Sequence, residues 1–100
     1  MKNAVYDELI EKAKDIAQRK NSNYAIPSDP LSNFRESEKI GIPGSIGIMM
    51  RIQDKYLRIC WLIQGEPDRV NESVEDTLLD LANYSILMIC MLRDEQKPKK

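Results

Sequence analysis

Three stretches of the chain carry hydrophobic residues at spacings of three and four, which is the period of an α-helix. These stretches cover residues 4–19, 45–64 and 72–93. The pattern therefore predicts an all-α fold with three principal helices.

Residues that favour helix ends flank these stretches. Asn3 is a suitable N-cap for the first helix, and either Asn71 or Ser73 for the third. The Asn-Ser-Asn run at 21–23 is expected to end the first helix. The Gly-Glu-Pro run at 65–67 is expected to end the second.

The connector over residues 21–44 contains signals for a further short helix. Asp29 followed by Pro30 is typical of an N-cap and a first helical position. Gly41 is suited to the residue that follows a helix. We therefore predict a short connector helix over residues 30–39.

The second half of the third helix, residues 81–92, is apolar nearly all round. Such a helix needs cover on several sides, and two other long helices can barely supply it. We therefore expect a homo-oligomer, a helical bundle whose core crosses the subunit boundary. Residues 1–96 are expected to form one helical domain, and residues 97–100 a disordered basic tail.

Composition narrows the possible functions. A net charge of −1 gives no general attraction to a nucleic-acid polymer or a membrane surface. The longest apolar run, residues 84–92, is too short to span a bilayer, so we expect a cytoplasmic protein, in the cytosol of a bacterial host. The chain lacks histidine, and Cys60 and Cys90 lie in apolar helical pattern. Ser-His and Cys-His catalysis and the common zinc sites are thereby excluded.

Acidic residues form a stripe on the third helix. Glu72, Asp76 and Asp80 follow one another at intervals of four, with Asn83 beside them. Carboxylates on a buried helix need a positive partner. That partner is either Mg²⁺, which prefers oxygen ligands, or the basic residues of the second helix.

Basic residues form a matching stripe on the second helix. Arg51, Lys55 and Arg58 could clamp phosphate oxygens, because guanidinium and ammonium groups both donate to them. The alternative is that they compensate the acidic stripe or face solvent. Asp54 lies within the same stripe and could order Lys55 or Arg58 locally.

Two aromatic residues stand in the polar connector. Tyr24 and Phe34 could stack on a base, while Asn33 or Ser32 could form hydrogen bonds with its edge. The alternative for Phe34 is that it anchors the short helix to the core.

Residues 51–58 and 72–84, together with the connector run at 31–34, resemble a small family of phage and bacterial domains associated with nucleotide modification. More distantly, the third helix is similar to an acidic helix of the MazG-like all-α nucleoside triphosphate pyrophosphatases. That resemblance implies nucleotides as ligands and acidic residues that hold Mg²⁺ against a triphosphate.

The chain departs from the MazG-like pattern in two places. The spacing from Asp76 to Asn83 matches, but Ser73 stands where that family has a glutamate, with Glu72 one step further back. The second helix lacks the E-E-x-x-E motif expected on the preceding helix and carries basic residues instead. A site with one basic wall can bind a phosphorylated ligand, but it is poorly built to activate water.

We therefore predict a protein that binds, and in a phage could sequester, a phosphorylated nucleotide or a cyclic nucleotide signal used in host defence. The predicted ligand-binding residues lie mainly between the second and third helices: Arg51, Lys55 and Arg58 for phosphates, Asp76 and Asp80 to orient them, Tyr24, Asn33 and Phe34 for base or ribose, with Asn83 and Tyr84 beside them.

Two alternatives remain at this point. The first is a Mg²⁺-dependent pyrophosphohydrolase, with metal ligands Glu72, Asp76, Asp80 and Asp54. The second is a structural interaction module without a ligand, in which the charged stripes only pair the helices.

Overall fold

The computed structural model describes residues 2–24, 29, 31–67 and 73–98. This part of the chain is helical, which confirms the predicted all-α fold and its three principal helices. Among the described helices, none combines the length and the apolar composition that a membrane crossing requires. The elements are α1 (Ala4–Tyr24), η1 (Ser32–Phe34), η2 (Glu36–Ile40), α2 (Gly44–Ile63) and α3 (Val74–Glu95), the two η elements being 3₁₀-helices.

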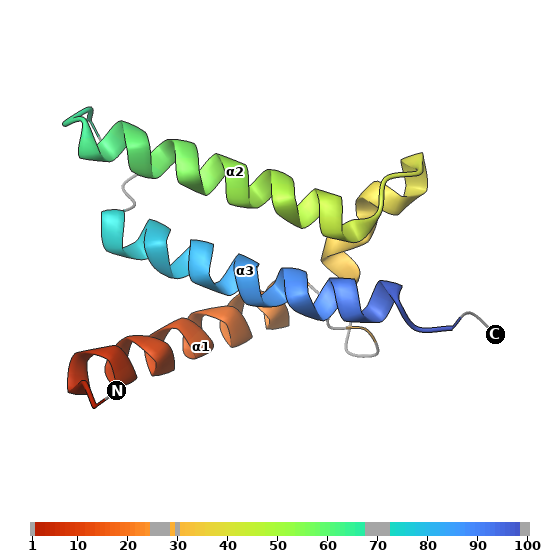
Figure 1. Cartoon of the computed structure of the whole chain (residues 1–100), viewed down its shortest axis with the longest axis horizontal. Helices are drawn as coiled ribbons and strands as arrows, with labels where there is room; N and C mark the ends of the chain where they lie inside the picture. Colours follow the sequence, from red (N-terminus) through yellow and green to blue (C-terminus); the bar gives the residue numbers. More distant parts are fainter. Residues whose placement is uncertain (1, 25–28, 30, 68–72, 99–100) are drawn as a thin grey trace.

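The three long helices are arranged around α3. Figure 1 shows α3 between α2 and α1, with α2 and α3 running antiparallel. The short helices η1 and η2 lie near the start of α2 and contact it. α3 therefore contacts both of the other long helices and is the central element of the fold.

Side chains cap the first turns of α1 and α3. Ser73 Oγ accepts a hydrogen bond from the Asp76 backbone N–H at 3.0 Å, so Ser73 is the N-cap of α3. Asn3 Oδ1 accepts from the Tyr6 N–H at 3.1 Å at the start of α1. Such caps satisfy backbone donors that have no partner inside the helix. The open choice between Asn71 and Ser73 is thereby resolved.

α1 is longer than the sequence predicts. Residues 21–23 were expected to end it, but the helix continues through them to Tyr24. Ser and Asn have only a modest preference against helix, which tertiary contacts readily override. One such contact comes from Lys20, whose Nζ donates to Asp80 Oδ1 of α3 at 2.8 Å.

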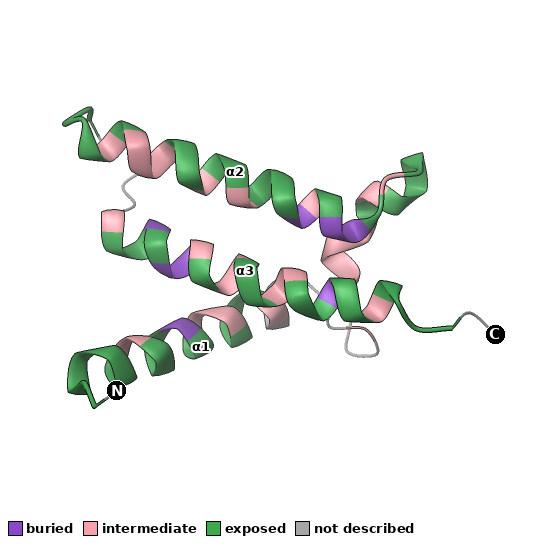
Figure 2. Ribbon diagram, in the orientation of Figure 1, coloured by how far each residue is buried: buried purple, intermediate pink, exposed green. Residues whose placement is uncertain are grey.

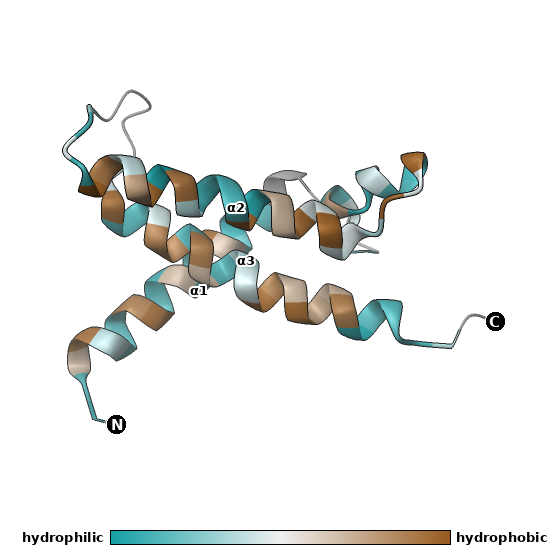
Figure 3. Cartoon of the chain, turned by 45° about the horizontal axis from the view of Figure 1, so that its top comes forward, coloured by the Kyte–Doolittle hydropathy of each residue, from teal (hydrophilic) through white to brown (hydrophobic). Residues whose placement is uncertain are grey.

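The buried core of the described residues is small. It contains four hydrophobic side chains, which are Ala13, Ile48, Leu79 and Met91. Figure 2 shows how few positions along the three long helices are buried. Figure 3 shows hydrophobic segments recurring along α2 and α3, and many of these remain exposed.

The predicted connector helix over residues 30–39 is present in the described residues as helical structure of the 3₁₀ type. It consists of the 3₁₀-helices η1 and η2, which are separated by Arg35 at φ −91° and ψ 0°. The prediction of Gly41 as the end signal is confirmed, since Gly41 has a φ of 80° and follows η2 directly. Left-handed backbone of this kind favours glycine.

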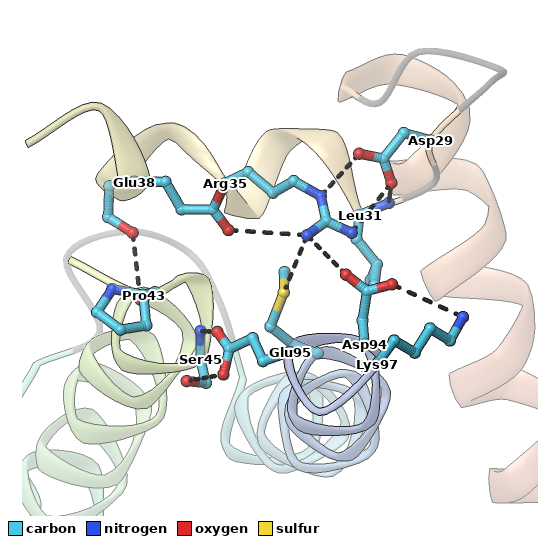
Figure 4. Close-up of polar contacts among 11 residues, drawn as sticks. Asp29, Leu31, Arg35, Glu38, Pro43, Ser45, Asp94, Glu95 and Lys97 are labelled. Atoms are coloured by element: carbon cyan, nitrogen blue, oxygen red, sulfur yellow. Dashed lines mark hydrogen bonds and ion pairs between the residues drawn. The ribbon is translucent and has the colours of Figure 1, made fainter. Parts of the chain in front are cut away.

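Arg35 explains why the connector breaks where it does. Its Nε donates to Asp29 Oδ2 at 2.7 Å, and its Nη1 lies 2.9 Å from Asp94 Oδ2 near the end of α3 (Figure 4). Nη1 also contacts the Met91 sulfur at 3.6 Å. The hydrogen bond to Asp29 is the main reason that the pKa of Arg35 is raised. Arg35 therefore holds the connector against α3.

A second contact closes the same end of the molecule. Both the backbone N–H and the hydroxyl of Ser45 donate to the carboxylate of Glu95, at 3.0 and 2.8 Å (Figure 4). Glu95 thus satisfies a free donor in the first turn of α2 and complements the positive end of its dipole. The antiparallel register of α2 and α3 is secured at this point.

Candidate functional site

A cavity of about 890 Å³ lies where α1, the connector, α2 and α3 meet. Its volume is within the range of ligand pockets in proteins, roughly 300–1,000 Å³. Its lining combines aromatic, cationic, acidic and amide side chains, drawn from four segments that are far apart in the sequence. The lining residues are Ala17, Gln18, Lys20, Asn21, Asn33, Phe34, Glu36, Arg51, Asp80, Asn83, Tyr84 and Leu87.

Phe34 organises one wall of this cavity. Its ring meets Tyr84 of α3 edge to face, with centroids 6.2 Å apart and an interplanar angle of 89°. The guanidinium carbon of Arg51 lies 5.5 Å from the centroid of the same ring. A cation over an aromatic face is attracted by the ring quadrupole. Phe34 therefore positions both a second aromatic ring and a phosphate-binding type of side chain.

Asp80 is the central acid of the site. Its Oδ1 accepts from Lys20 Nζ at 2.8 Å, and its Oδ2 lies 3.0 Å from Lys55 Nζ. The side chain of Asp80 is 10% exposed, that of Lys55 20% and that of Lys20 51%. Burial alone would raise the pKa of the Asp80 carboxyl, but the hydrogen bonds from Lys20 and Lys55 outweigh it and lower that pKa.

This arrangement joins three helices through one carboxylate. It is the interhelical pairing that the sequence left open as an alternative for the acidic stripe, with an additional lysine from α1. Two lysines against one aspartate leave a local excess of positive charge. Because Lys20 is half exposed and lines the cavity, it is the member of the group that a ligand can reach.

Two asparagines complete the polar lining. Asn83 Nδ2 donates to the backbone carbonyl of Ala13 at 2.9 Å, which attaches α1 to α3 beside the cavity. Asn33 Oδ1 is buried without a hydrogen-bond partner in the described part of the structure. A buried acceptor in that state is costly, so the position of Asn33 is held by its surroundings rather than by its own hydrogen bonds.

The structure brings together six of the predicted ligand-binding residues. Lys55 stands behind the lining in contact with Asp80, while Asp76 is exposed at the start of α3 and Arg58 is half-buried outside the lining residues. The side chain of Tyr24 lies outside the described residues. The six that line the cavity are Asn33, Phe34, Arg51, Asp80, Asn83 and Tyr84.

The contribution of α1 to the site was not predicted. Lys20 and its neighbours Gln18 and Asn21 were treated as the end of a structural helix, yet all three line the cavity. One signal was available in the sequence. Ala13 and Ala17 place small side chains on the same face of α1 as Lys20. Small side chains on that face leave room for a cavity between α1 and the neighbouring helices.

The predicted metal ligands do not converge. In the described ranges, no group of three or more acidic or cysteine side chains lies close enough to hold a metal ion. Asp54 and Asp76 are exposed, and Asp80 is already bound by two lysines. Glu72, the fourth predicted ligand, lies outside the described residues. Within the described part of the chain, Asp54, Asp76 and Asp80 therefore do not form the cluster of oxygen ligands around one point that Mg²⁺ binding needs.

Fold and site together define a small all-α domain with a ligand-sized cavity of mixed charge. Residues 46–92 match the family described as nucleotide modification associated domain 1. Over this segment, the match confirms the resemblance to domains associated with nucleotide modification that was inferred from the sequence. The searches of curated proteins and of solved structures find no match. The matched segment supplies Arg51, Asp80, Asn83 and Tyr84 to the cavity, whereas α1 and the connector lie outside it.

Proposed function

We propose that the chain binds a phosphorylated nucleotide in this cavity and keeps it intact. The observation that carries the proposal is the aromatic and cationic wall formed by Phe34, Tyr84 and Arg51. Aromatic rings offer a stacking surface to any base, at about 1–3 kcal/mol per base. The guanidinium of Arg51 offers the planar fork that phosphate oxygens accept from.

The charge balance of the site supports a phosphorylated ligand over a neutral one. Two cations, Arg51 and Lys20, line the cavity with two carboxylates. Asp80 is shared between Lys20 and Lys55. Glu36 pairs with Lys39 at 2.7 Å. A phosphate group would draw Lys20 partly away from Asp80 without leaving Asp80 unpaired. Arg51 and Lys20 are therefore the proposed phosphate contacts, and Asn33 and Asn83 the proposed contacts for base or ribose.

The arrangement of carboxylates favours binding over pyrophosphohydrolysis. Hydrolysis of a triphosphate of the MazG-like type requires acidic residues that converge on Mg²⁺. The described carboxylates do not converge, and the most central of them is bound by lysines. Retention of an intact nucleotide is the outcome that such a site supports. In a phage, that outcome would withhold a nucleotide signal from host defence, a role proposed from the family resemblance.

Titration calorimetry with ATP, GTP and a cyclic dinucleotide tests the proposal, each with and without Mg²⁺. At least one of the three is expected to bind without Mg²⁺. Arg51→Ala is expected to weaken that binding about tenfold or more, because hydrogen bonds to charged groups are worth about 1.5–3 kcal/mol. Arg93→Ala, which removes the same charge from an exposed position of α3 outside the lining, is the matched control.

Three outcomes would contradict the proposal. The first is the absence of binding for all three nucleotides. The second is equal weakening by Arg51→Ala and Arg93→Ala, which would indicate a general charge effect rather than a site. The third is release of pyrophosphate from ATP or GTP with Mg²⁺, abolished by Asp80→Ala, which would identify a hydrolase.

A further inference from the structure

A broad apolar surface on α2 and α3 remains exposed in the described part of the chain. Seven large hydrophobic residues of α2 and four of α3 are exposed, with Ile63 at 72% and Tyr56 at 59%. Single exposed hydrophobic residues are ordinary, whereas a continuous group of them marks an interaction site. We call its central part the open face, defined by Met49, Tyr56 and Ile63 of α2 with Leu78, Ile89 and Leu92 of α3.

The hydrophobic residues of the open face recur at regular spacing along both helices. Met49, Tyr56 and Ile63 recur every seven residues, so they lie on one line along α2. Leu78 and Leu92 stand fourteen residues apart on α3 and lie on a similar line, with Ser85 midway between them. Such a repeat is typical of a helix surface that packs against another helix along its whole length.

The open face lies on the opposite side of the helix pair from the cavity. A helix turns about 100° per residue, so Arg51 points roughly 200° away from Met49 on α2. On α3, Leu92 comes nine residues after Asn83, so the two side chains point to roughly opposite sides of the helix. Because Arg51 and Asn83 both line the cavity, a partner on the open face would leave the cavity accessible.

The exposed area of the chain indicates how large the missing cover is. The chain exposes 7698 Å². A compact folded protein of this mass exposes about 5,800 Å², which leaves an excess of about 1,900 Å². The radius of gyration is 15.2 Å, against about 13 Å for a compact domain of this length. The excess belongs to the whole chain, including the exposed Val5, Tyr6 and Ile10 of α1. A standard interface buries about 800 Å² per partner, so an interface of that size on the open face fits within the excess.

We propose that a second copy of this chain covers the open face, in a two-fold dimer that packs α2 and α3 of each copy into a four-helix layer. A second copy supplies an equally large and equally apolar surface, and a two-fold axis brings the same patch of the two copies into contact. The charged residues of α2 that flank the cavity, Arg51 and Lys55, stay outside this interface. The dimer does not depend on nucleotide binding.

Sedimentation velocity over a range of concentrations tests the dimer. The sedimentation of the wild-type chain is expected to correspond to a mass twice that of one chain, which is 11.6 kDa. Ile89→Glu puts a charge in the centre of the open face. It is expected to weaken the dimer roughly thirtyfold or more, the effect of an interface hot spot. Tyr56→Glu repeats the test from α2, should Ile89→Glu lose its helical circular dichroism.

Ile40→Glu is the matched control, since Ile40 is 77% exposed in η2 and lies away from the open face. It is expected to leave the dimer unchanged. A wild-type chain that sediments as a monomer at about 100 μM would overturn the proposal. So would a dimer that Ile89→Glu and Tyr56→Glu both leave intact, because another face would then hold the copies together.

Discussion

The two sides of the α2–α3 pair differ sharply. The side toward α1 and the connector carries Arg51, Lys55 and Asp80, and its polar groups find partners at distances of 2.8 to 3.0 Å or line the cavity. The other side is the open face, whose large apolar side chains are between 39% and 72% exposed in the described part of the chain. One side is organised by specific charge contacts, and the other by unspecific apolar surface.

This difference suggests a division of labour within one helix pair. Charge contacts are directional and can be rearranged by a ligand, so they suit a binding site. Apolar surface gives affinity in proportion to its area and suits a permanent contact. Substitutions on the polar side should therefore alter stability and ligand binding, while substitutions on the open face should alter assembly.

Asp80→Asn is expected to have the largest effect on the polar side. The substitution should lower the free energy of unfolding by about 2–3 kcal/mol at pH 7. Breaking a buried ion pair usually costs about 3–5 kcal/mol, and the cost is lower here because Lys20 can turn into solvent. Urea unfolding at a fixed protein concentration measures this, since a dimer makes stability depend on concentration. Nucleotide binding should be retained or tightened, because Lys20 is released.

Asp76→Asn is the matched control for that change. Asp76 is exposed in the first turn of α3, so its substitution is expected to cost only the dipole contribution, about 0.3–1 kcal/mol. Equal unfolding curves for Asp80→Asn and the wild type would show that the lysine contacts contribute nothing. Loss of nucleotide binding in Asp80→Asn would contradict the role proposed for Lys20.

The pH dependence of stability gives a second, smaller effect at the same residue. The folded pKa of Asp80 is lowered, so its contribution is present above the unfolded value of about 4 and is lost as the pH falls through the lower folded value. The wild type is therefore expected to lose more stability below about pH 4 than Asp80→Asn does. Parallel acid titrations of the two proteins, followed by circular dichroism, measure the difference. Identical curves would contradict it.

Asn83→Ala is expected to have the smallest effect of the three. It removes the hydrogen bond to the Ala13 carbonyl and should cost about 1 kcal/mol, with α1 less firmly attached. Hydrogen exchange is expected to quicken in α1 and not in α2. Lys12→Ala, which breaks the exposed pair of Lys12 with Glu75, is the control and should change neither measurement. Exchange that quickens equally in α1 and α2 would argue against a local attachment.

Sequence reasoning located the helices whose hydrophobic period is strong. α2 begins at Gly44 and α3 at Val74, within two residues of the predicted starts, because strong turn and cap signals precede both. The end of α1 was predicted wrongly, and the division of the connector helix into two 3₁₀-helices was not predicted. Both depend on contacts with α3, made by Lys20 and Arg35, that no local pattern contains.

The candidate site divides in the same way. Arg51, Asp80 and Asn83 could be found from charge and amide spacing on two adjacent helices. Lys20 could not, because its place in the cavity depends on where α1 crosses α3. Arg58 and Asp76 share the spacing of the site residues but point elsewhere. Helical spacing defines a face, and only packing decides which part of that face borders a cavity.

Mass spectrometry of small molecules released by heating the freshly purified protein tests the central claim most directly. We expect an intact phosphorylated nucleotide from the wild-type chain, clearly reduced in Arg51→Ala and unchanged in Arg93→Ala. A released molecule without phosphate, or a nucleotide recovered equally from all three proteins, would contradict nucleotide binding in this cavity.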